Sequence, residues 1–305
     1  MNRRSFLVSV AGAAAAARAF AAERKGFPGT LCFFSKHLPR LDGRGLARAL
    51  KPLGFGGVDL TVRRGGHVAP ENAAALLPGF VEAIRGEGLS VPMITTDLLR
   101  ASDPNAAPIF ETAGRLGIPF LKPGYWRYAF VDIRHELAVA AADLRSLAEL
   151  AAKAGVQIGF HNHSGYLGGS VWDIAPAIDV LPVKWVGYYF DPRHAFVEGG
   201  DGGWRSALNL AAPRLKMVAV KDFFWEKGAK GWQIHDCPLG EGMVKWKDVF
   251  AAFARARFDG PISMHFEYDV GGATPEAEQD NMLAAAAKDL AFLKAGLSEA
   301  YGGNQ

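Results

Sequence analysis

A repeating order of helix, glycine, strand and polar loop is the feature that most constrains the fold of this chain. Three copies are plain in the sequence: LARALKPLGFGGVDLTV, AAPIFETAGRLGIPFLK and IRHELAVAAADLRSLAELAAKAGVQIGF. In each copy a helical stretch ends at a glycine (Gly54, Gly117 or Gly155), and a short apolar strand follows. The repeat predicts parallel strands joined by helices.

Eight strands are expected in all, about 30 to 40 residues apart. Their predicted ranges are Thr30–Ser35, Val58–Val62, Ser90–Thr95, Ile118–Lys122, Val156–Phe160, Trp185–Asp191, Leu215–Lys221 and Ile262–Glu267. They predict a single-domain (β/α)8 TIM barrel over residues 28–300. A doubly wound open sheet is the alternative, but no glycine-rich fingerprint follows the first strand. Aromatic residues on both sides of Lys227–Gly231 predict a hairpin inserted after the seventh strand.

The first 21 residues predict an export signal. Arg3 and Arg4 precede a short run of small apolar residues, and Ala19-Phe20-Ala21 offers a cleavage site. The segment resembles a twin-arginine signal, so we expect the export machinery as a partner and a periplasmic or otherwise exported location. An uncleaved amphipathic tail is the alternative. Three of the 34 basic residues and none of the 31 acidic residues lie in this segment, so the mature chain is formally neutral. A neutral chain argues against nucleic-acid binding.

Polar residues gather where the predicted strands end, and in a TIM barrel the carboxyl ends of the strands form the active face. Alternation along a strand separates side chains that point into the barrel from those that meet the helices. The polar residues expected inside the barrel are Asp59, Thr61, Arg63, His161, His163, Asp191, Lys221, His265 and Glu267. Lys36, His67, Lys122 and His194 lie at strand ends or in the loops just beyond them.

Each of these residues alone has a structural explanation. Lys36 and Lys122 suit solvated strand ends, Asp59 suits an ion pair near the barrel floor, and His265 suits a hydrogen-bonded interior. Charged groups at the ends of at least six strands would be costly in a purely structural core. Their convergence therefore favours a functional pocket.

The motifs FHNH, DPRH, KD and HFE follow strands five to eight in that order, and with them the chain resembles the xylose isomerase-like TIM-barrel superfamily. FSKHL, KDFFW and PLGEGMV are similar to a subgroup of exported barrels described as sugar phosphate isomerases or epimerases. The resemblance implies a sugar isomerase or epimerase that acts on a keto-sugar or sugar derivative through a metal-stabilised enediolate. Alternatives are a 3-keto-glycoside lyase or hydrolase, a non-catalytic carbohydrate-binding barrel and, least favoured, an endonuclease IV-like nuclease.

The resemblance also implies one divalent cation held by Glu, Asp, His and Glu from strands five to eight. Asp191 and Glu267 match two of these positions, whereas His161 and Ala219 stand at the other two. We therefore expect an altered, mixed nitrogen and oxygen set for Mn, Zn, Co or Fe, made by His161, His163, Asp191, Glu267 and His235, the last from the hairpin. The alternative is that metal binding is lost and the two histidines of HNH hydrogen-bond a sugar.

Catalytic roles are expected for three residues. Glu267 would move the proton, Lys221 would stabilise developing negative charge, and His194 resembles the family's substrate-contacting histidine. Substrate contacts are expected from Lys36, Arg63, His67, Lys122, Trp126 and His265. The expected partner is a small carbohydrate, with a homo-oligomer left open.

Overall fold

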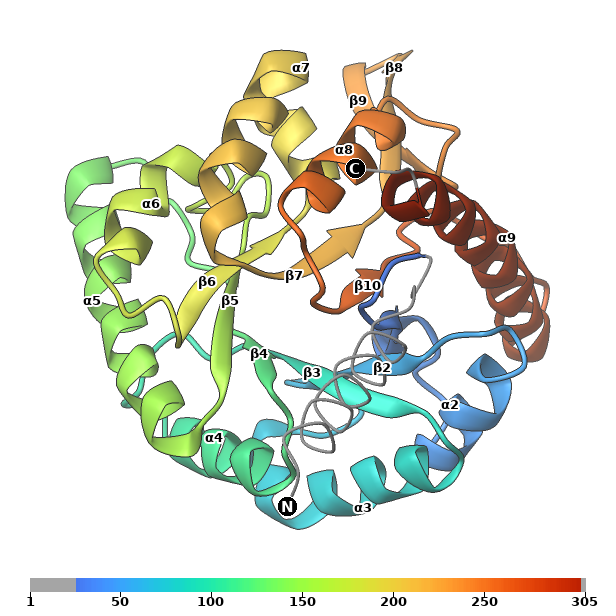
Figure 1. Cartoon of the computed structure of the whole chain (residues 1–305), viewed down its shortest axis with the longest axis horizontal. Coiled ribbons are helices and arrows are strands. Elements are labelled where there is room, and N and C mark those ends of the chain that lie inside the picture. Colours follow the sequence, from blue (N-terminus) through green and yellow to red (C-terminus); the bar gives the residue numbers. More distant parts are fainter. Residues whose placement is uncertain (1–25, 303–305) are drawn as a thin grey trace, which may run out of the picture.

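The computed structural model describes residues 26–302, which form a closed barrel of parallel strands ringed by helices (Figure 1). The barrel strands are β1 (Leu31–Phe34), β2 (Gly57–Val62), β3 (Ser90–Thr96), β4 (Phe120–Lys122), β5 (Gln157–His161), β6 (Val186–Phe190), β7 (Leu215–Val220) and β10 (Ile262–Met264). They pair in sequence order, and β10 closes the ring between β7 and β1. The predicted (β/α)8 barrel with one domain is confirmed.

Within residues 26–302, eight α-helices cover the outside of the barrel, and three short 3-10 turns lie between a strand and a helix. They are α2 (Gly43–Leu50), α3 (Ala73–Gly86), α4 (Ala106–Arg115), α5 (Ile133–Ala154), α6 (Val171–Asp179), α7 (Pro192–Ala211), α8 (Trp246–Arg255) and α9 (Pro275–Gly302), with η1 (Ser35–His37), η2 (Pro70–Asn72) and η3 (Ala212–Arg214). Capping explains the bounds of α5: the Asp132 side chain accepts from the His135 amide, and Gly155 leaves the helix with a φ of 73°.

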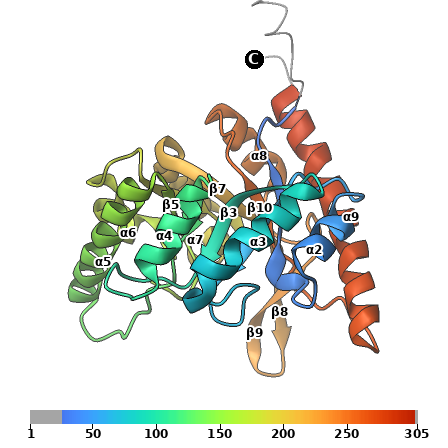
Figure 2. The ribbon, with the colours of Figure 1, turned by 90° about the horizontal axis from the view of Figure 1, so that it is seen from below.

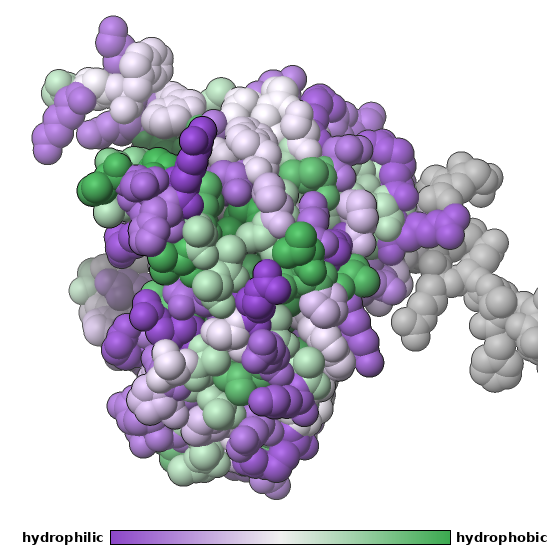
Figure 3. Space-filling model, turned by 90° about the vertical axis from the view of Figure 1, so that its left-hand side faces the viewer, coloured by the Kyte–Doolittle hydropathy of each residue, from purple (hydrophilic) through white to green (hydrophobic). Residues whose placement is uncertain are grey.

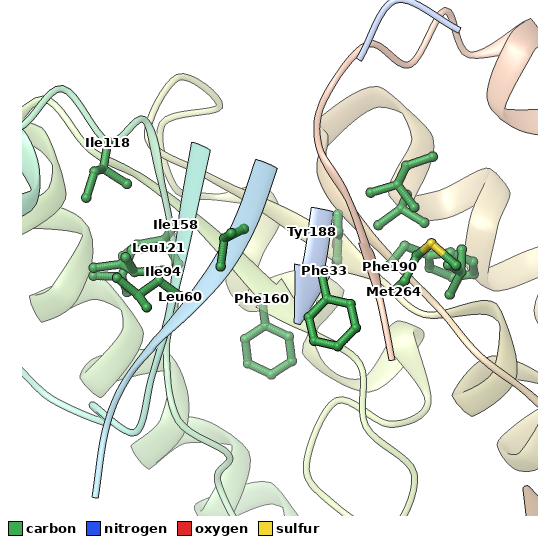
Figure 4. Close-up of a cluster of buried hydrophobic side chains, with 14 of the residues drawn as sticks. Phe33, Leu60, Ile94, Ile118, Leu121, Ile158, Phe160, Tyr188, Phe190 and Met264 are labelled. Atoms are coloured by element: carbon green, nitrogen blue, oxygen red, sulfur yellow. The ribbon is translucent and has the colours of Figure 1, made fainter. Parts of the chain in front are cut away.

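The core lies between the strands and the helices, where alternate strand residues such as Leu60, Ile94 and Phe160 are buried (Figure 4). A smaller cluster fills the barrel interior and consists of Met93, Tyr189, Met217 and Ala219. The interior positions above this cluster carry polar side chains, so the interior is closed at its floor and polar toward the carboxyl ends of the strands.

The predicted hairpin is also confirmed. Strands β8 (Asp222–Gly228) and β9 (Gly231–Cys237) pair antiparallel directly after β7, and they project beyond the barrel (Figure 2). The buried Asp222 carboxylate holds the base of the hairpin, because it accepts from the amides of Gly240, Gly242 and Val244 and from the Trp246 indole. A Cβ at Gly242 would lie 2.2 Å from Asp222 Oδ1, so this close approach requires glycine.

Strand eight is shorter than predicted. It ends at Met264, so His265 and Glu267 lie just beyond it rather than inside a strand Ile262–Glu267. The His265 amide still donates to Val220, but the Phe266 amide donates to Nε2 of His37 instead of a neighbouring strand. Because the Phe266 amide bonds to this side chain and not to a neighbouring strand, the chain leaves the sheet here and continues across the mouth of the barrel.

The predicted export signal, residues 1–21, lies outside the described residues. Among residues 26–302, no helix combines the length and apolar character needed to cross a bilayer. Figure 3 shows one side of the helix ring, over α5 and α6, where apolar side chains are scattered among polar ones.

Candidate active site

Asp191 is the centre of the site that the predicted polar residues form at the carboxyl end of the barrel. Its side chain is fully buried. Its Oδ2 atom lies 3.4 Å from His161 Nε2, 3.6 Å from His194 Nε2 and 3.3 Å from Lys221 Nζ. These residues come from β5, α7 and the end of β7, so the barrel brings together three of the four motifs.

The local sequence explains why Asp191 is held so firmly. It is the N-cap of α7, where its Oδ1 accepts from the His194 amide at 3.1 Å and Pro192 begins the helix. Asn162, the central residue of HNH, donates its side-chain amide to the Asp191 carbonyl and accepts from the Asp191 amide. The capping bond uses Oδ1 and leaves Oδ2 to face the site.

His161, Asp191 and His194 form a group that can hold a metal ion. One ligand atom from each residue lies within 4.8 Å of the others, and all three residues are buried. Nε2 of His194 is buried without a hydrogen-bond partner in the described structure, so this nitrogen faces the site unsatisfied. Two imidazoles and a carboxylate form a donor set that suits Zn, Mn, Co or Fe. The residues present fit a transition metal, with His194 in the group.

The other three predicted ligands take different places. His163 lies with its ring centroid 3.8 Å from that of His194, and its Nδ1 lies 2.9 Å from the Ser164 carbonyl. Glu267 pairs with lysines. His235 is exposed on the hairpin, where it pairs with Glu226 at 3.3 Å, and its contacts among the described residues do not include the site. The antiparallel register pairs His235 with Phe224 and directs it outward.

Glu267 is held by two lysines at the mouth of the barrel. Lys36 Nζ lies 2.9 Å and 2.8 Å from its two carboxylate oxygens, and Lys221 Nζ lies 4.0 Å from Oε1. His265 Nδ1 is 3.9 Å from the same oxygen. Lys221 therefore stands between the carboxylates of Asp191 and Glu267.

The pKa values of these groups follow from burial and from the lysines. Burial acts to raise the pKa of Asp191, but the Lys221 charge and the His161 hydrogen bond outweigh it and lower the pKa to about 2. Glu267 behaves in the same way, with Lys221 and Lys36 lowering its pKa to about 2. Burial lowers the pKa of His161 to about 3 and that of His163 to about 4. Both carboxyls are ionised and both imidazoles neutral at pH 7.

A buried chain of hydrogen bonds supports the site from below. Asp59 accepts from Thr95 and Ser263 at 2.8 Å each, and Tyr189 Oη lies 3.4 Å from Asp59 Oδ2 and 3.1 Å from His265 Nε2. Burial raises the pKa of Asp59 to about 6, although these hydrogen bonds oppose the shift. His265 is thus fixed in orientation by the interior of the barrel.

Of the predicted substrate-binding residues, Lys122 and Arg63 pack on aromatic rings, whereas His67 is bonded within its own loop. Lys122 lies at the end of β4 with its ammonium 3.2 Å from the Tyr125 ring centroid, and Arg63 covers the Phe34 ring. His67 is engaged inside its own loop, with Nδ1 on Thr61 and Nε2 on the Leu38 carbonyl.

Trp126 does not reach the site. Its indole stacks on Phe160 and donates to Asp143 of α5, because its side chain points into the helix layer.

Tyr125 and Tyr189 are site residues that the sequence did not disclose. Tyr125 Oη lies 2.8 Å from His161 Nδ1, and Tyr189 stacks on His161 with ring centroids 4.5 Å apart. The alternation along β6 could have revealed Tyr189, since Asp191 two residues later points inward. No comparable pattern marks Tyr125, which follows Lys122 in an irregular loop.

Comparisons with known proteins agree with this architecture. A model of the family described as xylose isomerase-like TIM barrel matches residues 47–295. Inosose dehydratase of Lacticaseibacillus casei is 25% identical over 146 residues, a stretch that covers 44% of this chain and 48% of the relative, so the match spans about half the relative's length.

Two solved structures share the fold. D-psicose 3-epimerase from Clostridium cellulolyticum H10 has a TM-score of 0.66 and 14% identity, over 88% of this chain and 99% of that one. A 3-keto-D-glucoside 4-epimerase from E. coli has a TM-score of 0.66 and 15% identity, over 88% of this chain and 99% of that one. The family match covers most of the residues that build the barrel and the site, and the chain belongs to the xylose isomerase-like TIM-barrel family.

Proposed function

We propose that this chain is an enzyme that transfers a proton at a carbon next to the carbonyl group of a keto-sugar or sugar derivative. The observation that carries the proposal is the position of Lys221, with its ammonium 3.3 Å from Asp191 and 4.0 Å from Glu267 at the barrel mouth. An ammonium so placed can stabilise an enediolate oxygen while a neighbouring carboxylate takes up the proton.

Glu267 accepts the proton in this proposal, because it is an ionised carboxylate at the mouth and lies outside the His161–Asp191–His194 group. Lys36 donates to both carboxylate oxygens of Glu267 and so fixes the direction of the carboxylate, and the same contact lowers the pKa of Glu267. Lys221 stabilises the negative charge that develops on the substrate oxygen. His194 presents its unpartnered Nε2 to the same space and contacts a substrate hydroxyl when no metal occupies it.

We further propose that a divalent transition metal, Mn, Zn, Co or Fe, binds to His161, Asp191 and His194. When bound, it would act as a Lewis acid that polarises the substrate carbonyl. Tyr125 would then orient His161 through its Nδ1, as partners of ligating histidines generally do.

Carbohydrate binding is proposed for the remaining polar residues at the mouth. Lys36, Arg63, Lys122 and His265 supply donors for hydroxyl groups, whereas both ring nitrogens of His67 are engaged inside its own loop. The same enediolate can end in epimerisation or in elimination. The proteins similar to this chain include two epimerases and a dehydratase, which supports a shared proton-transfer step. An exported location, proposed from residues 1–21, favours free or oxidised glycosides over phosphorylated sugars.

The test is conversion of a panel of ketohexoses and 3-keto-glycosides, with products identified by NMR. Wild type should give epimers, isomers or unsaturated products, and the type of product decides between isomerase and lyase. Glu267→Gln should lower the rate by at least about 100-fold. Glu226→Gln, on the exposed hairpin, is the matched control and should leave the rate unchanged. Sugar binding without conversion of any compound would instead support a carbohydrate-binding barrel.

A further inference from the structure

The ammonium of Lys221 already forms an ion pair with the Asp191 carboxylate. Three nitrogens lie near the same oxygen, Asp191 Oδ2: Lys221 Nζ at 3.3 Å, His161 Nε2 at 3.4 Å and His194 Nε2 at 3.6 Å. A metal at a normal bond length of about 2.1 Å from that oxygen would lie within about 5.5 Å of the Lys221 ammonium. The Lys221 side chain is only 5% exposed, so water screens this repulsion poorly.

Charge balance at the mouth points in the same direction. Asp191 and Glu267 supply two negative charges, and Lys221 and Lys36 supply two positive charges within 4.0 Å of them. The group is therefore neutral before any ion binds. A divalent cation would leave it with a surplus of positive charge beside the buried Asp191 and Lys221 side chains.

Arg193 adds a second obstacle at His194. Its Nη1 lies 3.2 Å from His194 Nδ1, and a guanidinium can only donate, so Nδ1 is the acceptor and Nε2 carries the hydrogen. Metal binding through Nε2 needs this hydrogen to leave. The other tautomer then has Nδ1 donate to Ser164 Oγ, which lies 2.9 Å away, and gives up the Arg193 contact.

We infer that Lys221 is the resident cation of Asp191 and Glu267, and that a metal binds to His161, Asp191 and His194 only in competition with it. Ala219, two residues earlier on β7, offers no ligand, and the side chain of Lys221 fills the position between the two carboxylates. The inference rests on the metal group of the proposed function. It assigns the barrel a built-in positive charge for a substrate oxygen that does not depend on metal.

The experiment titrates Mn²⁺, Zn²⁺ and Co²⁺ separately into metal-free wild type and Lys221→Met by isothermal calorimetry, and measures bound metal after dialysis. Lys221→Met, which keeps the side-chain length and removes the charge, should bind at least about tenfold more tightly than wild type. Lys216→Met is the matched control and should bind metal as wild type does, because Lys216 lies on β7 and its ammonium donates to the Gln157 side chain in wild type. His161→Ala in the Lys221→Met background should abolish the gain.

Thermal unfolding gives a second readout that does not depend on tight binding. Added metal should raise the melting temperature of Lys221→Met more than that of wild type, because only a ligand that binds the folded state stabilises it. Lys221→Gln repeats the test if Lys221→Met folds poorly. Equal affinities in wild type and Lys221→Met would overturn the inference and leave the proposed function standing. Absence of binding in both proteins would overturn the metal group itself, and the inference with it.

Discussion

At the scale of single residues, Asp191 has two tasks that its two oxygens divide. Oδ1 caps α7 and Oδ2 faces His161, His194 and Lys221. The DPRH motif is therefore both a helix start and a site, which explains why an aspartate followed by proline stands where strand six ends. Neither the helix cap alone nor the site alone would require an aspartate followed by proline at this position.

Tyr125 offers a prediction about how the first histidine of HNH is oriented. Tyr125→Phe removes the hydroxyl that meets His161 Nδ1 at 2.8 Å and leaves the ring in place. Metal affinity should fall by about 10- to 100-fold, because the partner of a ligating histidine fixes its tautomer and direction. Calorimetry measures the change.

Tyr166→Phe is the matched control for this prediction. Its ring lies 5.0 Å from that of Tyr125, and it should bind metal as wild type does. Equal affinities for wild type and Tyr125→Phe would show that the hydroxyl does not support the ligand.

Some of the site could be predicted from single residues and some could not. Asp191, Lys221 and Glu267 follow from strand ends and alternation, so their meeting at one face was foreseeable. The inclusion of His194 rather than His163 in the ligand group depends on the first turn of α7 and on the loop after β5. Loop conformation of this kind has no periodic pattern from which to read it.

At the scale of elements, the hairpin and the connection after it depend on one buried carboxylate. Asp222 accepts from three amides of the segment between β9 and α8 and from the indole of Trp246, the first residue of α8. Asp222 directly follows Lys221 in the sequence, yet the two side chains lie on opposite sides of the chain: Lys221 faces Asp191, whereas Asp222 faces the segment after β9. Neighbouring residues of an extended chain point to opposite faces.

Asp222→Ala should destabilise the protein by about 3 kcal/mol or more, because it leaves several buried donors without an acceptor. Urea unfolding followed by circular dichroism measures the free energy. Asp248→Ala is the control: Asp248 makes an exposed ion pair with Arg205 at 2.7 Å, and its loss should cost at most about 1 kcal/mol. A loss for Asp222→Ala as small as that for Asp248→Ala would contradict the structural role.

At the scale of the whole molecule, the (β/α)8 fold was predictable because a repeated unit leaves few topologies open. The strand bounds were less predictable. Strand eight stops at Met264 because the His37 side chain takes over the Phe266 amide, a contact between residues far apart in the chain. Tertiary contacts of this kind end elements without a local sequence pattern.

Acid should destabilise the whole barrel, beginning near pH 6.5. Burial lowers the pKa of His37 to about 3, of His161 to about 3 and of His163 to about 4, from an ordinary 6.5. Between these pH values the three histidines are protonated in the unfolded chain and neutral in the folded chain, so the free energy of unfolding falls as the pH falls. Asp59 opposes this trend, since its raised pKa of about 6 favours the folded state in acid.

Melting temperatures from pH 8 to pH 4 test this expectation. The melting temperature should fall below pH 6.5, and His37→Gln, which keeps an acceptor for the Phe266 amide, should make the fall shallower by the equivalent of about 2 kcal/mol. His135→Gln, at the exposed start of α5, should leave the profile of wild type unchanged. A profile without a fall below pH 6.5 would contradict the burial of neutral histidines.

The measurement that tests the central claim most directly is exchange of substrate hydrogen with solvent in D₂O, followed by NMR and mass spectrometry on ketohexoses and 3-keto-glycosides. Proton transfer beside a carbonyl predicts deuterium at the carbon next to it, in recovered substrate or in product, with wild type and not with Glu267→Gln. Epimerisation or isomerisation returns a proton to carbon and so places deuterium in the product, whereas elimination leaves the carbon unsaturated and gives deuterium only in substrate that is reprotonated before the leaving group departs. Conversion to an epimer or isomer with no deuterium in substrate or product would contradict the account.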